Sequence, residues 1–547
     1  MFTSLAARGI AKSHGPLVVL DGIDLTIGPA SRAGIVGPNG VGKTTLLRIL
    51  AGLDGADRGS VRLSPKTATV GYLPQEPETA AGETLLELLA RRTGVRQAEA
   101  EFDRWSAALG REEPGAEERY AAALDRYLDL GAPDFRPRAE EVCASLDLPP
   151  DRLDIEVAHL SGGQAARSSL AAILLSRFDV FLLDEPTNDL DFAGLDRLET
   201  FLSGIEGGVV VVSHDRAFLE RTIETVIEID EASRTAAEYH GGWSAYVEGR
   251  DTAWRHQEEA FAGYQSDRRR LEARAREQRQ WATTGARTAK KQAPDNDKAQ
   301  RDWRVNRTEK QASKVRITEK ALQRLEVVDK PWEGWDLHLE ITSAGRSGDN
   351  VASLRGAVVE RGTFRLGPVD LDIAWAERVS VLGDNGSGKT TLLNALLGRL
   401  PLTAGQQSLG PGVVIGELDQ GRRQLLGHES LLDAFTAAAG ILAQEARSTL
   451  AKLGLTADDV SRSASTLSPG ERTRAALALL MAKGSNCLVL DEPTNHLDLP
   501  AIEQLEAALS TYDGTLLLVT HDRRLLEAVE TTRVIEVSAG AVAERAA

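Results

Sequence analysis

The amino-acid sequence predicts an α/β fold of two repeated domains joined by a long antiparallel α-helical hairpin. A set of short motifs occurs twice, in the same order, along the 547 residues, which indicates a duplicated domain. In each copy, apolar segments of strand length alternate with helical segments, as in a mainly parallel sheet covered by helices. About 95 highly charged residues lie between the two copies.

These observations define the expected domain boundaries. The first domain is expected at residues 1–240 and the second at 336–547, with the hairpin linker at 241–335. The first domain is expected to carry an additional helical arm at about 95–141. The tip of the hairpin is expected at about 283–295.

Each copy opens with the same order of predicted elements: a strand-like segment, a second strand, a glycine-rich loop and a helix. In the first copy, these segments lie at Val18–Ile27, Ala33–Val36 and Thr44–Leu50. In the second copy, they lie at Val369–Ile373, Val379–Leu382 and Thr390–Leu397. A glycine loop between a strand and a helix is the context that a phosphate-binding loop requires.

The two glycine-rich loops are predicted to bind ATP. Their backbone N–H groups and the helix N-terminus behind them can hold phosphate, while the Lys reaches the β- and γ-phosphates and the Thr ligates Mg²⁺. The predicted residues of the first loop are Gly37, Pro38, Asn39, Gly40, Val41, Gly42, Lys43, Thr44 and Thr45. Those of the second are Gly383, Asp384, Asn385, Gly386, Ser387, Gly388, Lys389, Thr390 and Thr391.

Polar residues after each loop complete a predicted site for phosphate chemistry. An Asp at the end of an apolar strand would contact the Mg²⁺ shell, and the Glu after it would polarise the attacking water. A Gln can sense Mg²⁺ and the water, and a His can bond the γ-phosphate. The predicted catalytic residues are Gln75, Glu185, His214, Gln420, Glu492 and His521. The predicted Mg²⁺ ligands are Thr44, Gln75, Asp184, Thr390, Gln420 and Asp491.

The copies differ in length at one place. Lys43 and Ser161 are 118 residues apart, whereas Lys389 and Ser468 are only 79 apart. The additional residues contain two amphipathic helical patterns around Gly115, which predict the arm. A binding role and a purely structural elaboration are both open for it.

The linker is predicted to form two antiparallel helices. The stretches Glu248–Ala282 and Asp297–Leu325 have high helix propensity and no proline. Between them, Gly285 and Pro294 favour a break. Apolar positions are too sparse for a strong heptad coiled coil.

The linker is basic, although the chain as a whole is acidic. Residues 268–324 contain 18 Lys and Arg and 7 Asp and Glu, a local charge of +11, while the whole chain carries −17. A basic insert on an acidic body indicates a polyanionic partner, with a solvated charged hairpin as the alternative. The candidate RNA contacts are Arg268, Arg269, Arg270, Arg274, Arg276, Arg287, Lys290 and Lys291.

Composition excludes several protein classes. No apolar run approaches the roughly 18–20 residues of a membrane helix, and the first residues lack the apolar region of a secretory signal. Cys143 and Cys487 are the only cysteines, so no disulfide framework is expected. These observations predict a cytoplasmic protein without membrane contact.

The segments Leu160–Gln164 and Leu467–Glu471 carry a resemblance to a known family. Leu-Ser-Gly-Gly-Gln is the signature of the ATP-binding cassette superfamily, and the second copy has Leu-Ser-Pro-Gly-Glu. Two fused cassettes with a charged helical linker resemble the F subfamily, which contains translation factors and antibiotic-resistance proteins. The linker phrases at 296–300 and 330–335 resemble the macrolide-type resistance members of actinobacteria.

The resemblance implies two P-loop ATP-binding cassette domains that pair head to tail within one monomeric chain. Each ATP would lie between the phosphate loop of one domain and the signature of the other. The implied signature contacts are Ser161, Gly162, Gly163 and Gln164 for one site, and Ser468, Gly470 and Glu471 for the other.

The two sites are not expected to be equivalent. Pro469 lacks a backbone donor and Glu471 replaces a Gln, so both sites are expected to hydrolyse ATP at unequal rates. The residue that stacks on adenine is open: His14 is the candidate in the first copy and Phe364 in the second.

The resemblance implies an ATP-hydrolysing translation factor that binds the ribosome. ATP binding would close the cassettes and set the angle of the hairpin, which would contact rRNA and tRNA near the tRNA exit region and the peptidyl-transferase centre. Macrolide resistance by ribosome protection and the regulation or rescue of translation are both open.

Two other functions compete with this interpretation. The chain could be the ATP-binding subunit of a drug (macrolide) exporter with separate membrane subunits, but the basic hairpin then has no purpose. It could also be a cassette ATPase that binds DNA structures. Such relatives often carry a basic C-terminal coiled coil, which this sequence does not predict.

Overall fold

A computed structural model describes residues 3–74, 80–160, 162–291, 317, 320–322, 324–325, 345–362, 364–418, 425 and 430–546. The chain forms two compact units. One contains Met1–Ser244 together with Trp335–Ala547, and the other is Ala245–Gly334. The two repeated domains therefore belong to a single unit.

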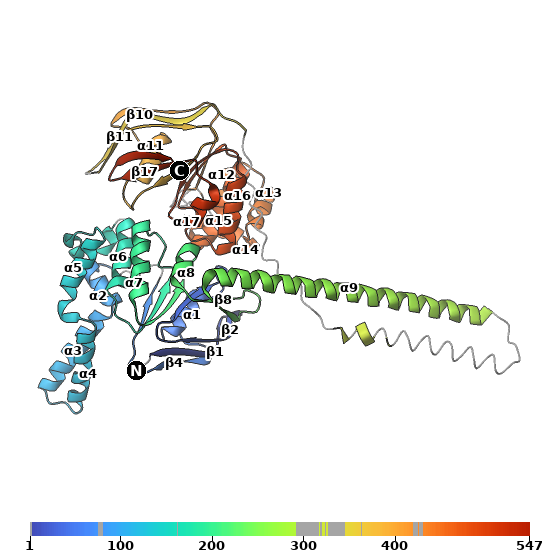
Figure 1. The fold of residues 1–547 in the computed structure, drawn as a ribbon, viewed down its shortest axis with the longest axis horizontal. Coiled ribbons are helices and arrows are strands. Elements are labelled where there is room, and N and C mark those ends of the chain that lie inside the picture. The colour runs from blue at the N-terminus through green and yellow to red at the C-terminus, as the bar shows by residue number, and fades with distance from the viewer. Residues whose placement is uncertain are drawn as a thin grey trace. The chain divides into compact units, whose positions relative to one another are not determined.

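The first domain contains the elements drawn from blue to green in Figure 1. Its strands are β1 (Ser4–His14), β2 (Leu17–Ile27), β3 (Arg32–Val36), β4 (Arg58–Ser64), β5 (Val70–Leu73), β6 (Val180–Asp184), β7 (Gly208–Val212), β8 (Thr225–Ile229) and β9 (Ala236–His240). Its α-helices are α1 (Lys43–Leu50), α2 (Leu85–Arg92), α3 (Val95–Gly110), α4 (Ala116–Asp129), α5 (Phe135–Ser145), α6 (Gly162–Leu175), α7 (Phe192–Gly204) and α8 (Arg216–Thr222). Short 3₁₀ helices are η1 (Ala132–Asp134), η2 (Pro150–Asp154) and η3 (Val157–His159).

In the part of the second domain that the structure describes, a similar order of elements recurs without counterparts of α3 and α4. Its strands are β10 (Asn350–Arg361), β11 (Phe364–Ala374), β12 (Arg378–Leu382), β13 (Ala404–Leu409), β14 (Ile415–Leu418), β15 (Cys487–Asp491), β16 (Thr515–Val519), β17 (Arg533–Ser538) and β18 (Ala541–Ala546). Its helices are α11 (Lys389–Leu396), α12 (Leu431–Ala439), α13 (Ala443–Lys452), α14 (Ala457–Ser461), η5 (Ala464–Thr466), α15 (Pro469–Lys483), α16 (Leu499–Thr511) and α17 (Arg523–Val529).

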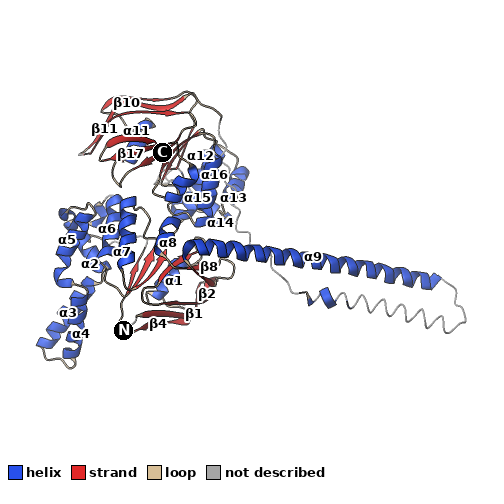
Figure 2. Cartoon of the chain, in the orientation of Figure 1, coloured by secondary structure: helices blue, strands red, loops and turns tan. Residues whose placement is uncertain are grey.

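Each domain is built on a mainly parallel sheet, as the sequence predicts, and this sheet has six strands. Figure 2 draws the strands in red. The strand orders are β5-β6-β7-β3-β8-β9 and β14-β15-β16-β12-β17-β18, with the last strand of each antiparallel. The central strands β6, β7, β15 and β16 are buried along their whole length, which explains their continuous apolar sequences. Parallel strands bring the residues that follow their carboxyl ends to one edge of the sheet.

Each domain also has a three-stranded antiparallel sheet that the motifs did not predict in full. The orders are β2-β1-β4 and β11-β10-β13. Shifts in register interrupt the pairing of β1 with β2, for example between Ala7 and Ile10. The apolar alternation along β1 is correspondingly broken, and this weakens the sequence pattern of a strand.

Two helices of the arm pack against each other. Figure 1 shows α3 and α4 side by side, and Gly115, with φ of 74°, directly precedes α4. The rings of Phe102 and Tyr127 stack at 4.8 Å, and Trp105 lies within 5.0 Å of the guanidinium groups of Arg104 and Arg119. These helices lie where the sequence predicts them, and the bounds 95–141 stay a prediction.

The long helix α9 (Gly242–Lys291) begins the linker. The predicted helix end at Ala282 is wrong, because the helix continues through Gly285 to Lys291. One glycine disfavours a helix by only about 1 kcal/mol relative to alanine, and the flanking Ala and Arg residues are good helix formers. Most of the predicted return helix lies outside the described residues, and the other domain boundaries stay predictions.

Cys143 and Cys487 are both buried and free of disulfides. Burial raises the pKa of the Cys143 thiol to about 11 and that of Cys487 to about 12. Across the described part of the chain, no helix combines the length and the apolar character that a membrane span requires.

Candidate active site

The two glycine-rich loops lie at equivalent positions, between β3 and α1 and between β12 and α11. Lys43 Nζ donates to the carbonyl oxygens of Gly37 (2.7 Å) and Pro38 (3.2 Å). Lys389 Nζ does the same toward Gly383 (2.6 Å) and Asp384 (3.2 Å). Each lysine therefore reaches across its own loop, where phosphate oxygens are expected.

Gly42 and Gly388 directly precede the helices behind the loops. Their φ angles are 110° and 113°, in the left-handed region that favours glycine. A Cβ at Gly42 would lie 2.7 Å from a Val19 methyl, and one at Gly388 would lie 2.6 Å from Phe364 Cζ. These positions leave no room for a side chain.

A hydroxyl and a carboxylate meet beside each loop. Thr390 Oγ1 donates to Asp491 Oδ2 at 3.0 Å, and the Thr44 side chain is likewise hydrogen bonded to Asp184. Tyr72 donates to Asp184 Oδ2 at 3.1 Å. Such oxygen donors suit Mg²⁺, so these pairs fit the predicted metal ligands. The other predicted ligands, Gln75 and Gln420, lie outside the described residues.

The predicted catalytic carboxylates are buried next to the predicted histidines. His214 Nε2 lies 3.2 Å from Glu185 Oε1, and His521 Nε2 lies 3.4 Å from Glu492 Oε1. Glu185 and Glu492 both have φ of 49°, which is unusual for non-glycine residues. The backbone has the same φ at both glutamates, which occupy equivalent positions directly after β6 and β15.

Burial controls the protonation of these groups. It raises the pKa of Glu185 to about 7 and that of Glu492 to about 8, although the neighbouring lysines lower both. It lowers the pKa of His521 to about 4 and that of His214 well below its usual value. Both histidines are therefore neutral near pH 7, and both glutamates have pKa values near those of effective general bases.

Each phosphate loop is hydrogen bonded to the opposite domain in a pseudo-symmetric way. The backbone N–H of Asn39 donates to Asp498 Oδ2 (3.1 Å), and that of Asn385 donates to Asp191 Oδ2 (2.9 Å). The side-chain amide of Asn39 also donates to the His496 carbonyl at 3.2 Å. That of Asn385 donates equivalently to the Asp189 carbonyl at 2.6 Å.

Two pockets of similar size lie along these contacts. The first, of about 470 Å³, is lined by Asn39, Gly40, Gly42, Lys43, Thr44, Thr45, Asp184, Glu185 and His214 together with Ser468, Gly470, Glu471 and His496 of the second domain. The second, of about 430 Å³, is lined by Asn385, Gly386, Gly388, Lys389, Thr390, Thr391, Asp491 and Glu492 together with Gly162 and Gly163 of the first domain.

The second signature is shaped by a reciprocal cap. Ser468 Oγ accepts from the Glu471 N–H at 3.2 Å, and Glu471 Oε2 accepts from the Ser468 N–H at 2.9 Å. Pro469 occupies the first turn of α15, where the missing N–H has no partner within the helix. In the first signature, Ser161 lies outside the described residues, and Gln164 follows the two lining glycines on α6.

Two hairpins contribute side chains to the pockets. His14 pairs with Leu17 across β1 and β2, and Arg361 pairs with Phe364 across β10 and β11. All four residues line their pockets. His14 is thus equivalent to Arg361 and not to Phe364, so the two adenine candidates occupy different positions of the hairpin.

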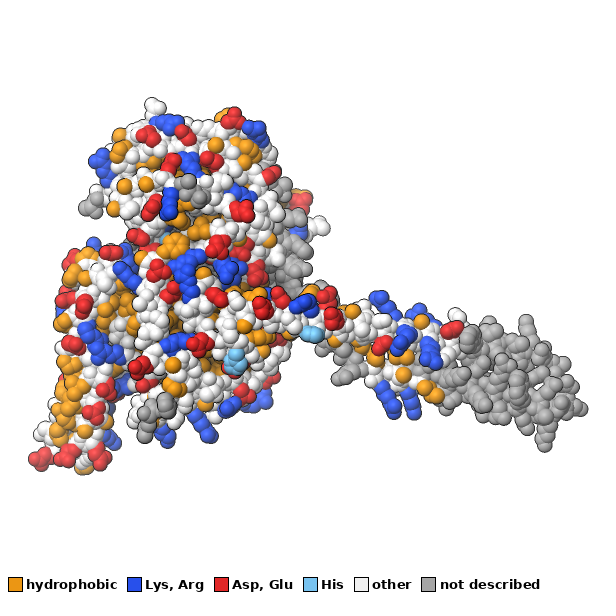
Figure 3. Space-filling view, viewed as in Figure 1, with side chains coloured by type: hydrophobic (Ala, Val, Ile, Leu, Met, Phe, Trp, Pro, Cys, Tyr) orange, Lys and Arg blue, Asp and Glu red, His pale blue; other side chains and the backbone are white. Residues whose placement is uncertain are grey.

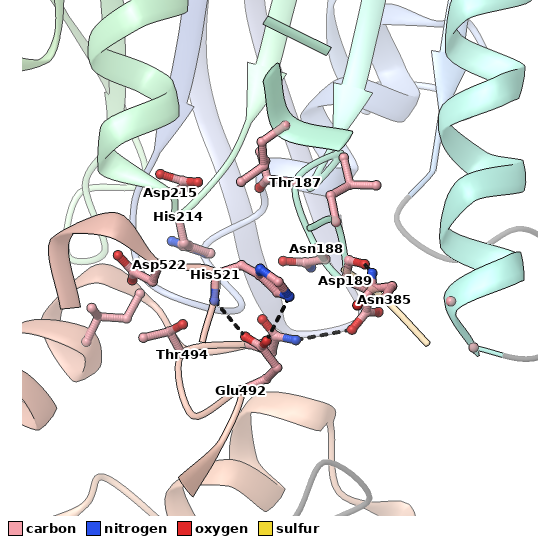
Figure 4. A pocket seen from close by; sticks show the side chains of 16 residues that line it. Thr187, Asn188, Asp189, His214, Asp215, Asn385, Glu492, Thr494, His521 and Asp522 are labelled. Atoms are coloured by element: carbon pink, nitrogen blue, oxygen red, sulfur yellow. Dashed lines mark hydrogen bonds and ion pairs between the residues drawn. The ribbon is translucent and has the colours of Figure 1, made fainter. Parts of the chain in front are cut away.

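A central pocket of about 150 Å³ lies between the two candidate sites (Figure 4). His214 and His521 both line it, together with the aspartates that follow them, Asp215 and Asp522. The contacts of these two His-Asp turns were not predicted from the motifs. The His follows the Glu at the same spacing in both copies. This repeat is the sequence signal that could have indicated the two turns as an equivalent pair.

Among the described side chains of α9, the arginines from Arg255 to Arg279 are exposed (Figure 3). Arg268 pairs with Glu272 at 3.0 Å and Arg270 with Asp267 at 3.0 Å, while Arg269 donates to Gln265. Arg274 and Arg276 are also exposed. Arg287, Lys290 and Lys291 belong to α9 as well, but their side chains lie outside the described residues.

Comparison with known proteins agrees with this architecture. The ABC transporter family matches residues 20–188 and 366–495. The tylosin resistance ATP-binding protein TlrC of Streptomyces fradiae is 36% identical over 96% of this chain and 95% of its own. The putative ATP-binding protein YdiF of Bacillus subtilis is 33% identical over 99% and 81%.

Further relatives include the energy-dependent translational throttle protein EttA of Mycobacterium tuberculosis, which is 30% identical over 95% of this chain and 89% of its own. Among solved structures, an archaeal ribosome recycling factor, aABCE1, has a TM-score of 0.57 at 19% identity, covering 98% of this chain and 89% of its own. That likeness concerns the fold alone.

The repeated sheets, phosphate loops and signatures define a tandem ATP-binding cassette protein. The chain belongs to the ATP-binding cassette superfamily and, within it, to the F family of tandem cassettes that includes TlrC and ABC transporter F family member 2 of Arabidopsis thaliana. Cassettes of this superfamily are ATPase domains that act with Mg²⁺.

Proposed function

We propose that the protein hydrolyses ATP at two composite sites, each formed by both cassettes. The observation that carries this proposal is the pair of pockets in which a phosphate loop of one cassette faces a signature of the other. The reciprocal hydrogen bonds of Asn39 and Asn385 support it, because they join each loop to the opposite cassette.

The buried groups account for a hydrolytic reaction. Lys43 and Lys389 bind the β- and γ-phosphates, and bound Mg²⁺ would neutralise charge on the same oxygens. Glu185 and Glu492 orient the attacking water and accept its proton. His214 and His521, neutral at pH 7, hold the γ-phosphate through Nε2. Gln75 and Gln420 are proposed to complete the metal shell.

Gly470→Ala is expected to impair the first composite site. A Cβ at Gly470 would lie 2.8 Å from Asn39 Nδ2 and 3.0 Å from the His496 carbonyl, so it would displace the signature from the loop or break the hydrogen bond between these two groups. With Glu492→Gln present to silence the second site, ATP turnover should fall about 10-fold or more, since small misplacements are costly in catalysis.

Gly163→Ala provides the matched control. Its Cβ would lie 3.3 Å from Asn385 Cβ, a tighter-than-usual contact that a small shift relieves. With Glu185→Gln present, its effect on the second site should be several-fold smaller. Equal losses in both variants would contradict the steric argument. Thermal unfolding would show whether either variant is merely destabilised.

We further propose that this ATPase acts on the ribosome in the cytoplasm. Exposed arginines along α9 provide a surface that can pair with rRNA and tRNA phosphates. Relatives named for translational throttling and for tylosin resistance support a role in translation. The acidic remainder of the chain disfavours other docking orientations on RNA. The hairpin tip near the peptidyl-transferase centre, and macrolide resistance, belong to this proposal.

The test is sedimentation of the Glu185→Gln, Glu492→Gln variant with 70S ribosomes. This variant should bind ATP without hydrolysing it, and should therefore migrate with ribosomes when ATP is present. Lys43→Ala, Lys389→Ala is the control, because it should not bind ATP and should stay at the top of the gradient. Free protein in both cases would contradict ribosome binding.

Drug susceptibility then separates the physiological roles. Expression of the gene should raise the tylosin concentration that stops growth if the protein protects ribosomes. Unchanged susceptibility to macrolides, with ribosome binding intact, would favour regulation or rescue of translation. Co-purification with an integral membrane protein would favour the exporter.

A further inference from the structure

Each switch histidine, His214 or His521, is followed two residues later by an arginine that forms an ion pair with the opposite cassette. Arg216 pairs with Glu506 of the second cassette. Arg523 pairs with Glu199 (3.0 Å) and Asp196 (2.6 Å) of the first. The side chains of Arg216 and Glu506 are only 13% and 14% exposed, so this pair is largely removed from water.

The acidic partners lie on equivalent faces of two helices. In α7, Phe192, Asp196 and Glu199 occupy positions i, i+4 and i+7, which share one face of a helix. In α16, the equivalent face carries Leu499, Glu503 and Glu506. The negative charge of Glu503 also favours the charged form of Arg216 and raises its pKa.

Each of the two arginines lies at the N-terminus of a helix, where a positive charge requires nearby carboxylates. Arg216 and Arg523 are the first residues of α8 and α17, directly after the capping residues Asp215 and Asp522. The N-terminus of a helix carries partial positive charge, so a cation there is unfavourable without nearby anions. Those anions come mainly from the other cassette, and α8 contacts α17 across the interface.

The second switch histidine has an additional contact. The Phe192 ring lies edge-on to His521, with centroids 5.2 Å apart, and the Arg523 guanidinium lies 5.6 Å from the Phe192 centroid. Leu499 occupies the equivalent place in α16. An aromatic ring thus restricts His521, whose Nε2 is 3.2 Å from Lys389 Nζ.

We propose that α7 and α16 are positioning elements that act in trans, each holding the His-Asp-Arg turn of the opposite cassette. The second site depends more strongly on this support, because Phe192 adds a contact to His521. This inference rests on the proposed hydrolysis at two composite sites. It assigns Arg216, Arg523 and Phe192 to the placement of the switch histidines, without contact with ATP.

The test measures one site at a time. In Glu185→Gln protein only the second site turns over ATP, and in Glu492→Gln protein only the first. Arg523→Glu should lower kcat about 10-fold to 100-fold at the second site with little change in KM, and should affect the first site less. Arg216→Glu should show the reverse pattern.

Reversal of the opposite charges provides the rescue. Adding Asp196→Arg and Glu199→Arg to Arg523→Glu should restore a large part of kcat at the second site. Arg346→Glu is the matched control, because Arg346 pairs with Asp349 on an exposed surface and should change neither site. Equal losses of kcat at both sites from either reversal would overturn the proposal, because they would indicate that these ion pairs only hold the two cassettes together.

The role of Phe192 is tested by replacing it with leucine, the residue at the equivalent position 499 of the other cassette. Phe192→Leu should lower kcat at the second site alone, and Phe192→Tyr should retain most of it. Unchanged kcat with Phe192→Leu would overturn the role of the ring. Absence of turnover in the parental Glu185→Gln and Glu492→Gln proteins would instead refute the proposed function, so the two failures are distinguishable.

Discussion

Replacing Glu185 and Glu492 together with Gln is expected to lower ATP turnover by about 10²–10⁴-fold, the usual contribution of a positioned general base. Both carboxylates are buried beside a lysine and a histidine, and Gln preserves their shape while removing the proton acceptor. The phosphate loops and Lys43 and Lys389 are unchanged, so ATP affinity should persist.

Release of inorganic phosphate checks turnover, and equilibrium binding of a fluorescent ATP analogue checks affinity. The single variants divide the activity between the two sites. The signatures differ through Pro469 and Glu471, so the remaining rates are expected to be unequal. Turnover close to wild type in the double variant would mean that these carboxylates are not the bases.

Neutralising the basic face of α9 is expected to weaken ribosome binding steeply and to reduce its dependence on salt. For each RNA phosphate that the protein no longer neutralises, the slope of log K against log[salt] should become shallower by about 0.7–0.9, because fewer counterions are released. The variant changes five exposed residues to Gln: Arg268, Arg269, Arg270, Arg274 and Arg276.

A matched variant controls for total charge. It changes five exposed arginines of the cassettes to Gln: Arg8, Arg58, Arg62, Arg346 and Arg355. Affinity would be measured by sedimentation between 50 and 200 mM salt, about the range in which such ionic interactions dominate. An unchanged slope for the α9 variant, or an equal change in both, would exclude α9 as the RNA contact. ATP turnover without ribosomes should be unaffected.

Much of each cassette could be predicted because its signals are local. The strand, loop and helix around Lys43 are consecutive, and so are the strand and carboxylates at Asp184 and Glu185, so spacing alone places them. The parallel sheet follows because a helix that crosses over between two strands returns the chain in the same direction.

Contacts between distant segments could not be predicted in this way. Arg216 and Glu506 are far apart in the sequence, and nothing near either residue indicates its partner. The equivalence of His14 and Arg361 depends on hairpin register, which the irregular pairing of β1 obscures. The end of α9 lies beyond its predicted position because Gly285 alone is a weak helix breaker.

The two buried cysteines have a practical consequence. Only a thiolate reacts rapidly with maleimides, and the high pKa values of Cys143 and Cys487 leave almost none at pH 7. The natural chain should therefore serve as a nearly silent background for dye attachment. Cysteines introduced on exposed faces of the two cassettes would then allow opening and closing to be followed by fluorescence energy transfer in single molecules.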